Sequence, residues 1–248
     1  MSVKEKKKED SQPRSRWVSM LRGIGYFFGC FIIALVVVSL VRVFLVQQYM
    51  VPSSSMEQTV LPGDKIAAWK PGEVERGDVV VFRDDLSWLR PIPETSAWLQ
   101  FLAWIKFAAP TDEQYLVKRV IGMPGDTVKC CESGRITVNG YTLDEPYVFL
   151  SYPDQDHDPF EIVVPEGRFF AMGDHRDDSW DSSMVLCATS SVERAPPSFD
   201  SIQGPVFAVV LPLSRIGGIP TQEVFSNVPP PSGPPPSVDD ARWNCPKG

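Results

Sequence analysis

A single long apolar segment, residues 25–46, constrains the fold of this chain most. It reads GYFFGCFIIALVVVSLVRVFLV, and Arg42 is its only charged residue. About 20 apolar residues are enough for a helix to cross a membrane. A cleaved signal peptide is the alternative, but its apolar centre is only about 7–15 residues long and is followed by a small-x-small cleavage site. We therefore expect an uncleaved transmembrane helix.

The charge distribution predicts how this helix is oriented. Residues 1–22 carry seven basic and three acidic side chains, a net charge of +4, whereas the whole chain has a net charge of −7. The positive-inside rule places residues 1–24 in the cytoplasm and the chain after residue 46 outside a plasma membrane that it crosses once. The acidic balance of the outer part argues against nucleic acid as a partner.

Short strand-like segments dominate the rest of the chain and predict an antiparallel, mainly β domain. Turn residues separate them. The expected strands are residues 65–69, 76–82, 115–122, 127–129, 135–138, 141–143, 161–164, 168–172 and 206–211. Two segments depart from this pattern. Residues 96–108 fit an apolar helix that packs on the sheet or touches the membrane, and the Pro-rich end of the chain is predicted to be disordered.

The five cysteines include Cys30 in the apolar segment and four further along the chain. None has the CxxC spacing typical of a zinc site, so we expect no metal. The adjacent Cys130 and Cys131 are not expected to pair, because neighbouring residues seldom reach disulfide geometry. One or two bonds among Cys130, Cys131, Cys187 and Cys245 remain open alternatives.

The run Ser53–Ser55 lies shortly after the apolar segment and raises the question of a nucleophile. A serine needs a base to attack at neutral pH, and the usual base is histidine. His157 and His175 are the only two histidines, and no serine lies in a Gly-x-Ser-x-Gly elbow. The chain also lacks Ser-x-x-Lys, which excludes the active site of penicillin-binding proteins.

Lys118 is the other candidate base. Strand alternation places Leu116, Lys118 and Val120 on one apolar face, and burial lowers the pKa of a lysine. The alternative is an edge strand whose lysine prevents aggregation. A polar loop, residues 172–183, supplies four aspartates, but it lacks the spacing of a calcium-binding EF-hand loop.

Taken in order, these segments resemble bacterial type I signal peptidases, membrane-bound Ser/Lys endopeptidases. The resemblance covers residues 25–219 and lies in four motifs: Pro52–Met56, Arg76–Phe82, Tyr115–Asp126 and Gly173–Ser182. It implies that Ser55 is the nucleophile and Lys118 the general base. Ser179 would orient the lysine, and the Ser53 hydroxyl would join the Ser55 N–H in an oxyanion hole. Arg176 and Asp181 would support the site. The walls of the substrate pocket would be Tyr49, Val51, Met56, Val60 and Val117.

The resemblance also implies the domain organisation and the partners. An antiparallel β catalytic domain, a fold that self-cleaving repressors share, would comprise residues 47–129 and 165–219. A smaller β insertion domain would occupy residues 130–164. Composition, rather than the resemblance, adds a Trp-rich insertion at residues 83–114, which packs on the sheet or touches the membrane, and a disordered tail at residues 220–248. The substrates would be secretory preproteins cut after small residues at positions −1 and −3. The lipid bilayer and the Sec or Tat translocase would be further partners, without any cofactor, in a high-GC Gram-positive bacterium.

The chain departs from the family pattern at several positions. His175 and Asp178 stand where asparagines are usual, Gln58 replaces a proline, and Ser183 replaces an arginine that would pair with Asp181. The role of Asp181 therefore stays open. His175 is not expected to be the base, because Lys118 occupies the base position. The alternative to an enzyme is an inactive homologue or an anchored binding module. The chain retains Ser55, Lys118 and Ser179, and an inactive homologue would be expected to have lost one of them.

Overall fold

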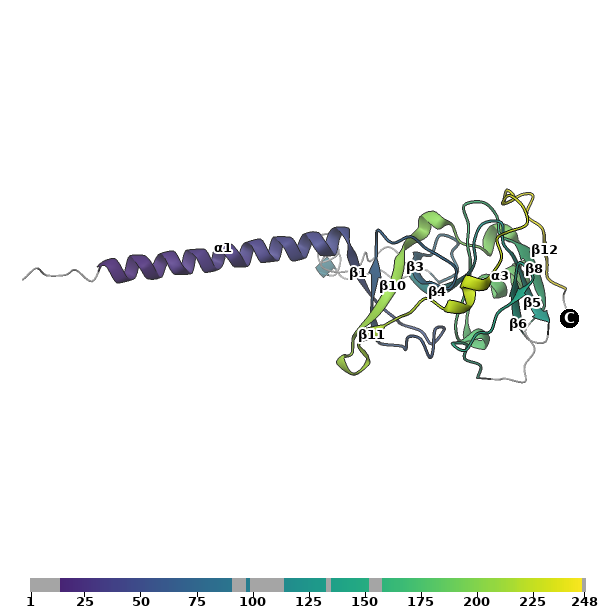
Figure 1. Cartoon of the computed structure of the whole chain (residues 1–248), viewed down its shortest axis with the longest axis horizontal. Coiled ribbons are helices and arrows are strands. Elements are labelled where there is room, and N and C mark those ends of the chain that lie inside the picture. The colour runs from purple at the N-terminus through teal and green to yellow at the C-terminus, as the bar shows by residue number, and fades with distance from the viewer. Residues whose placement is uncertain (1–13, 91–96, 99–113, 133–134, 152–157, 247–248) are drawn as a thin grey trace, which may run out of the picture. The chain divides into compact units, whose positions relative to one another are not determined.

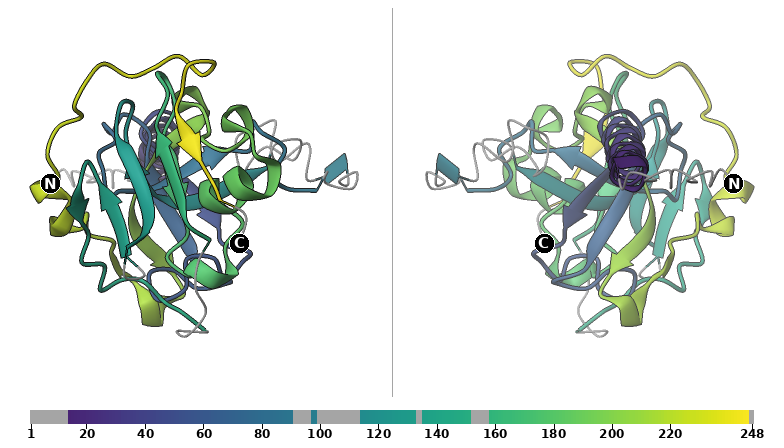
Figure 2. Two further views of the ribbon diagram at one scale, coloured as in Figure 1. Left: turned by 90° about the vertical axis from the view of Figure 1, so that its right-hand side faces the viewer. Right: turned by 90° about the vertical axis from the view of Figure 1, so that its left-hand side faces the viewer.

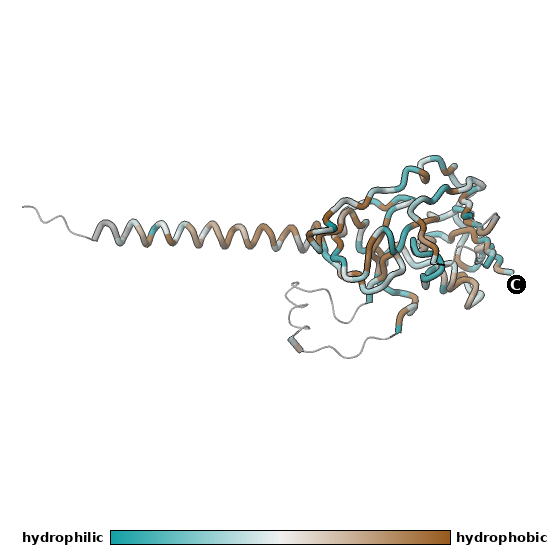
Figure 3. Tube along the Cα trace, turned by 90° about the horizontal axis from the view of Figure 1, so that it is seen from below, coloured by the Kyte–Doolittle hydropathy of each residue, from teal (hydrophilic) through white to brown (hydrophobic). Residues whose placement is uncertain are grey.

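The computed structural model describes residues 14–90, 97–98, 114–132, 135–151 and 158–246. The chain divides into two units, Met1–Phe44 and Leu45–Gly248. The first unit contains the helix α1, Arg14–Phe44. Within it, Ser19–Val41 is long and apolar enough to cross a membrane, and its most apolar 18 residues have a mean hydropathy of 2.7 (Figure 3). The helix thus includes most of the predicted segment and starts earlier, in the basic head.

The second unit consists mainly of two antiparallel sheets, so the predicted mainly β class is confirmed (Figure 1). The larger sheet has the order β1-β2-β10-β3-β4-β9, with β11 beside β10, and the smaller has the order β12-β8-β5-β6-β7. The strands of the larger sheet are β1 Val46–Met50, β2 Lys65–Trp69, β3 Val79–Arg83, β4 Tyr115–Gly122, β9 Phe170–Met172, β10 Ile202–Leu211 and β11 Gly217–Gly218. Those of the smaller sheet are β5 Thr127–Glu132, β6 Arg135–Val138, β7 Tyr141–Thr142, β8 Phe160–Val163 and β12 Trp243–Asn244.

Helices are few and short in the described part of this unit. The α-helix α3, Ser182–Thr189, was not predicted, although Asp181 caps it by accepting the N–H groups of Ser183 and Met184. The 3₁₀ helices are η1 Arg176–Asp178, η2 Val192–Arg194, η3 Phe199–Ser201, η4 Leu213–Arg215 and η5 Glu223–Asn227. The helix expected over residues 96–108 lies almost wholly outside the described residues, as does His157.

The Pro-rich tail is held against the smaller sheet, so the prediction of disorder is wrong for its described residues. Strand β12 pairs with β8, and Pro229 and Pro236 accept hydrogen bonds from Asn139 Nδ2 and Glu166 N, each at 2.8 Å. Figure 2 shows this segment in yellow, running to β12 beside the smaller sheet. The prediction rests on the many prolines and does not consider the apolar side chains of the tail that pack on the core: Val228, Val238, Ala241 and Cys245.

Two disulfide bonds are present among the described residues. Cys187 in α3 pairs with Cys245 in the tail. Cys130 pairs with its neighbour Cys131, contrary to the expectation from the sequence, and the peptide bond between them is cis. The number of bonds thus agrees with the expectation of one or two, whereas the expectation that Cys130 and Cys131 do not pair is wrong.

Candidate active site

The turn between β1 and β2 carries the serine run and is fixed by backbone hydrogen bonds. Val51 N–H donates to Asp64 O at 2.9 Å, Gly63 N–H donates to Val51 O at 2.8 Å, and Val60 N–H donates to Met56 O at 2.9 Å. Ser55 is only 9% exposed, and its Oγ lies 3.3 Å from Ser53 Oγ. The structure thus brings together the two serines that the sequence singled out as nucleophile and oxyanion donor.

Lys118 lies on β4 and is 2% exposed. Burial lowers its pKa to about 8, against the opposing attraction of Asp181, Asp174 and Asp178. The Nζ atom donates a hydrogen bond of 3.0 Å to Ser179 Oγ. The alternative of a solvent-facing lysine that guards an edge strand does not hold, because the Lys118 side chain is buried. A buried lysine with this pKa loses its proton close to neutral pH, as a general base requires.

The loop from β9 to α3 holds Ser179 in place. Asp181 caps α3 and also accepts the Gly173 N–H at 2.9 Å, while Ser182 Oγ accepts the Ala171 N–H at 3.1 Å. Ser183 stands in the place of the missing arginine, and its hydroxyl donates to Asp181 Oδ1 at 2.7 Å. The open question about Asp181 therefore has a structural answer: its carboxylate closes the loop that carries Ser179.

Gly173 marks the point where this loop meets the serine run. A Cβ atom added at Gly173 would clash with Ser179 Oγ and with Ser55 O. The neighbouring His175 N–H donates to Ser55 O at 3.1 Å. Among the described residues, no hydrogen bond joins Ser55 Oγ to Lys118 Nζ, and such catalytic bonds often form only with substrate bound.

Gly173→Ala is expected to lower kcat by about 100-fold, because the new methyl group pushes apart Ser55 and Ser179. Overpacking of this kind also costs about 1–3 kcal/mol of stability. Steady-state kinetics and thermal unfolding would measure both effects. Gly233→Ala is the matched control, since nothing lies within 4 Å of its added Cβ. A Gly173→Ala enzyme as active as the wild type would contradict this account of the loop contact.

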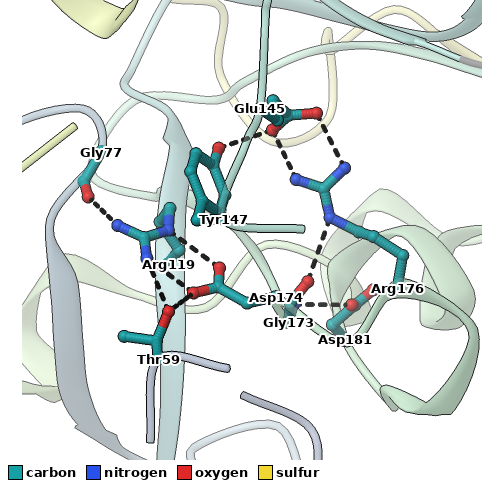
Figure 4. A network of polar contacts seen from close by, with 9 residues as sticks. All are labelled: Thr59, Gly77, Arg119, Glu145, Tyr147, Gly173, Asp174, Arg176 and Asp181. Carbon is teal, nitrogen blue, oxygen red and sulfur yellow. Dashed lines mark hydrogen bonds and ion pairs between the residues drawn. The ribbon is translucent and has the colours of Figure 1, made fainter. Parts of the chain in front are cut away.

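Sequence reasoning missed a buried ion pair next to Lys118 (Figure 4). Arg119 is 0% exposed, and its guanidinium binds both carboxylate oxygens of Asp174, at 2.8 and 2.6 Å. It also donates to Gly77 O at 2.6 Å and lies 4.1 Å from the centre of the Tyr147 ring. The available signal was a second charge in an apolar strand, since alternation turns Arg119 to the face opposite Lys118.

The network continues from Tyr147 to Arg176 (Figure 4). The Tyr147 hydroxyl donates to Glu145 Oε1 at 2.6 Å, and burial together with the Glu145 charge raises the pKa of that phenol, so it keeps its proton. Glu145 forms a two-point ion pair with Arg176, whose Nε donates to Gly173 O at 3.0 Å. Arg176 therefore connects residues 145–147 to the Ser179 loop.

The residues predicted as pocket walls all belong to one apolar cluster. Four are buried, namely Tyr49, Val51, Met56 and Val60, whereas Val117 is partly exposed at its margin. Their role as pocket walls stays a prediction. A cavity of 240 Å³ lies elsewhere, beside the Ser179 loop; Phe160, Met172 and Ser179 are among its lining residues, but Ser55 and Lys118 are not. It is therefore distinct from the predicted pocket.

Comparison with known proteins gives the family. The family model described as signal peptidase, peptidase S26 matches residues 24–210. A signal peptidase I from Mycobacterium tuberculosis is 34% identical over 213 residues, covering 75% of this chain and 72% of that protein. The chain belongs to the S26 signal peptidase family. Its match to the family model includes Ser55, Lys118 and Ser179, whereas the whole Pro-rich tail lies outside it.

Two further relatives are more distant. A signal peptidase I from Bacillus licheniformis is 31% identical over 162 residues, covering 61% of this chain and 73% of that protein. A solved signal peptidase I from Enterococcus faecalis is 22% identical, with a TM-score of 0.34, and covers 54% of this chain and 97% of that chain. That structural similarity is too weak to bear on the fold of this S26 family member.

Proposed function

We propose that this chain is a membrane-anchored serine endopeptidase that removes signal peptides from secretory preproteins. The relatives named above are signal peptidases I, and one observation supports the same activity here. Lys118 is buried, with its pKa lowered to about 8, and is hydrogen-bonded to Ser179 in the loop that contacts Ser55. A merely structural domain has no need for a buried lysine that loses its proton so readily.

The proposed mechanism uses Ser55 and Lys118 as a dyad. Neutral Lys118 takes the proton of Ser55 Oγ, which attacks the scissile carbonyl carbon. The Ser55 N–H and the Ser53 hydroxyl stabilise the oxyanion that forms. The Lys118 ammonium group then protonates the leaving amine, and a water molecule, deprotonated by Lys118, hydrolyses the acyl-enzyme. Ser179 keeps Nζ in place through its 3.0 Å hydrogen bond.

The substrate is proposed to bind as an extended strand beside the first half of β4. Strand β9 pairs only with Arg119–Gly122, so among the described strands none pairs with Leu116–Lys118 on that side. An added peptide strand would gain main-chain hydrogen bonds there. Val117 and the apolar cluster behind it would exclude large side chains at positions −1 and −3.

The location proposed for the catalytic unit is the outer face of the plasma membrane. The basic residues before α1 favour a cytoplasmic N-terminus. Two disulfide bonds in the second unit fit an oxidising compartment. Met50, Trp69 and Leu211 are exposed on the outward face of β1, β2 and β10, and together suit contact with lipid. The Sec or Tat translocase would deliver the substrates.

The test is cleavage of a preprotein by the full-length protein in detergent, with the new N-terminus identified by mass spectrometry. The wild type is expected to cut after a small residue, and Ser55→Ala to give no product. Ser226→Ala is the matched control, since Ser226 is exposed and its hydroxyl donates to Glu223 O within the same short helix. Equal cleavage by the wild type and Ser55→Ala would reject Ser55 as nucleophile. A wild type that cleaves no preprotein would favour the inactive-homologue alternative.

A further inference from the structure

We propose that His175 is a positioning residue for the oxyanion hole, and this inference rests on the function proposed above. Its ring is held between the serine run and residues 149–151, and only 4% of His175 is exposed. One ring nitrogen binds the carbonyl of Ser54, which belongs to the same peptide unit as the Ser55 N–H. The orientation of that peptide unit sets the direction of the proposed oxyanion donor.

The hydrogen-bond partners determine which ring nitrogen carries the proton. Nδ1 lies 3.3 Å from Ser54 O and 3.3 Å from a carboxylate oxygen of Glu57. Both neighbours only accept hydrogen bonds, so Nδ1 must be the donor. On the other side, Nε2 lies 2.7 Å from Ser151 Oγ and 3.2 Å from Asp177 Oδ1. Nδ1 therefore donates towards Ser54 O, while Nε2 lies between the Ser151 hydroxyl and the Asp177 carboxylate.

The surrounding backbone holds the ring in this position. His175 forms a parallel bridge with Phe149, whose N–H donates to Asp174 O at 2.8 Å and whose carbonyl accepts the Arg176 N–H at 3.1 Å. The Phe149 ring meets the imidazole edge to face, with their centres 4.7 Å apart. Rotation of the imidazole away from Ser54 is therefore opposed by packing as well as by hydrogen bonds.

The effect on Ser55 follows from peptide geometry. In a trans peptide the carbonyl and the N–H are coplanar and point in opposite directions. Ser54 O accepts the Glu57 N–H at 2.8 Å and the Nδ1 proton at 3.3 Å, so the two bonds together set the direction of the Ser55 N–H. When the carbonyl of a peptide unit accepts a hydrogen bond, the N–H of the same peptide unit becomes a stronger donor. His175 N–H fixes the next peptide unit by donating to Ser55 O at 3.1 Å. His175 thus forms a hydrogen bond with the peptide unit before Ser55 and with the one after it.

Three substitutions separate the two sides of the ring. In His175→Asn, the amide nitrogen stands near the position of Nδ1 and keeps the donor to Ser54. In His175→Gln, it stands near the position of Nε2 and keeps only the contact with Ser151. His175→Phe keeps the ring shape and loses both. The backbone bond from residue 175 to Ser55 O is unchanged in all three, so differences among them report the side chain.

The expected result is a kcat close to wild type for His175→Asn and about tenfold lower for His175→Gln and His175→Phe. KM is expected to stay within about twofold, because an oxyanion donor acts mainly in the transition state. Thermal unfolding of each variant separates this effect from a loss of folded protein. Equal kcat values for the Asn and Gln variants would overturn the proposal.

A second measurement does not depend on activity. The carbonyl 13C shift of Ser54 and the amide 15N shift of Ser55 in the full-length protein report the hydrogen bond directly. Both are expected to move in the Gln and Phe variants and to stay near wild type in His175→Asn. Unchanged shifts in all three variants would refute the positioning role. If Ser55→Ala cleaves like the wild type, the proposed function fails, and these shifts still decide whether His175 holds the peptide unit.

Discussion

Replacing Lys118 with methionine is expected to abolish cleavage and, below pH 8, to make the folded protein more stable than the wild type. Methionine has about the same length, fills the same buried space and carries no charge. Without a base, the Ser55 hydroxyl keeps its proton, so the loss of kcat should reach on the order of 10⁴-fold. The Ser179 hydroxyl loses one hydrogen bond, which costs only about 1 kcal/mol.

The stability gain follows from the lowered pKa of Lys118. The pKa is 10.5 in the unfolded chain and about 8 in the folded protein, because burial removes the ammonium group from water. Between these values the unfolded state binds more protons, so the stability of the wild type rises with pH there. Below pH 8 the burial of Lys118 opposes folding by on the order of 3 kcal/mol, at about 1.4 kcal/mol per pKa unit.

Denaturant unfolding of both proteins at pH 7 and pH 10 measures this effect. The advantage of Lys118→Met should be largest at pH 7 and nearly absent at pH 10, while wild-type kcat/KM should rise with pH through about 8. Lys129→Met is the matched control, because Lys129 and Glu161 form a surface pair with both side chains 46% exposed. The assigned pKa would be contradicted if Lys118→Met were less stable than the wild type by the same amount at pH 7 and at pH 10.

Arg119→Met is expected to be the most destabilising of the substitutions considered, at about 3–5 kcal/mol. It leaves the fully buried Asp174 carboxylate with the Thr59 hydroxyl, at 2.5 Å, as its remaining side-chain partner. It also leaves Gly77 O without its guanidinium donor. In a unit of this size, such a loss lowers the melting temperature by roughly 10 °C.

A double-mutant cycle separates the ion pair from its packing. Arg119→Met with Asp174→Leu removes both charges, and we expect it to be more stable than Arg119→Met alone, because no charge stays buried without a partner. Lys129→Ala breaks the exposed pair with Glu161 and should change stability by less than about 1 kcal/mol. Equal losses of stability in Arg119→Met and Lys129→Ala would show that the buried ion pair contributes no more to stability than the exposed one.

The sequence identified those parts of the fold whose signal is local. Alternation and turn residues located β2, β4 and β6 at their observed bounds, and the odd lysine in an apolar strand pointed to Lys118. The serine run and the Ser179 loop were recognisable as motifs, and the structure brings them into contact at Gly173. Their catalytic roles remain predictions, which the substitutions above test.

Other features were not predictable because they depend on distant parts of the chain. Arg119 pairs with a residue 55 positions away, so its partner is not visible in its own strand. The strand β1 has the sequence VQQYM, which lacks alternation and gains its place by pairing with β2. The Pro-rich tail folds against the smaller sheet because Val228 and Cys245 find apolar contacts there, which composition alone does not reveal.

A disulfide bond connects the Pro-rich tail to the helix that follows the Ser179 loop. Residue 245 is tied through its sulfur to Cys187 in α3, and α3 begins at the cap Asp181, two residues after Ser179. The same tail covers the outer edge of β8, which would otherwise present unpaired backbone groups to other chains. A protein shortened to the segment that the family model matches would therefore lose both a brace for the lysine-orienting loop and a guard against sheet-to-sheet association. An affinity tag is accordingly better placed before residue 14 than after residue 248.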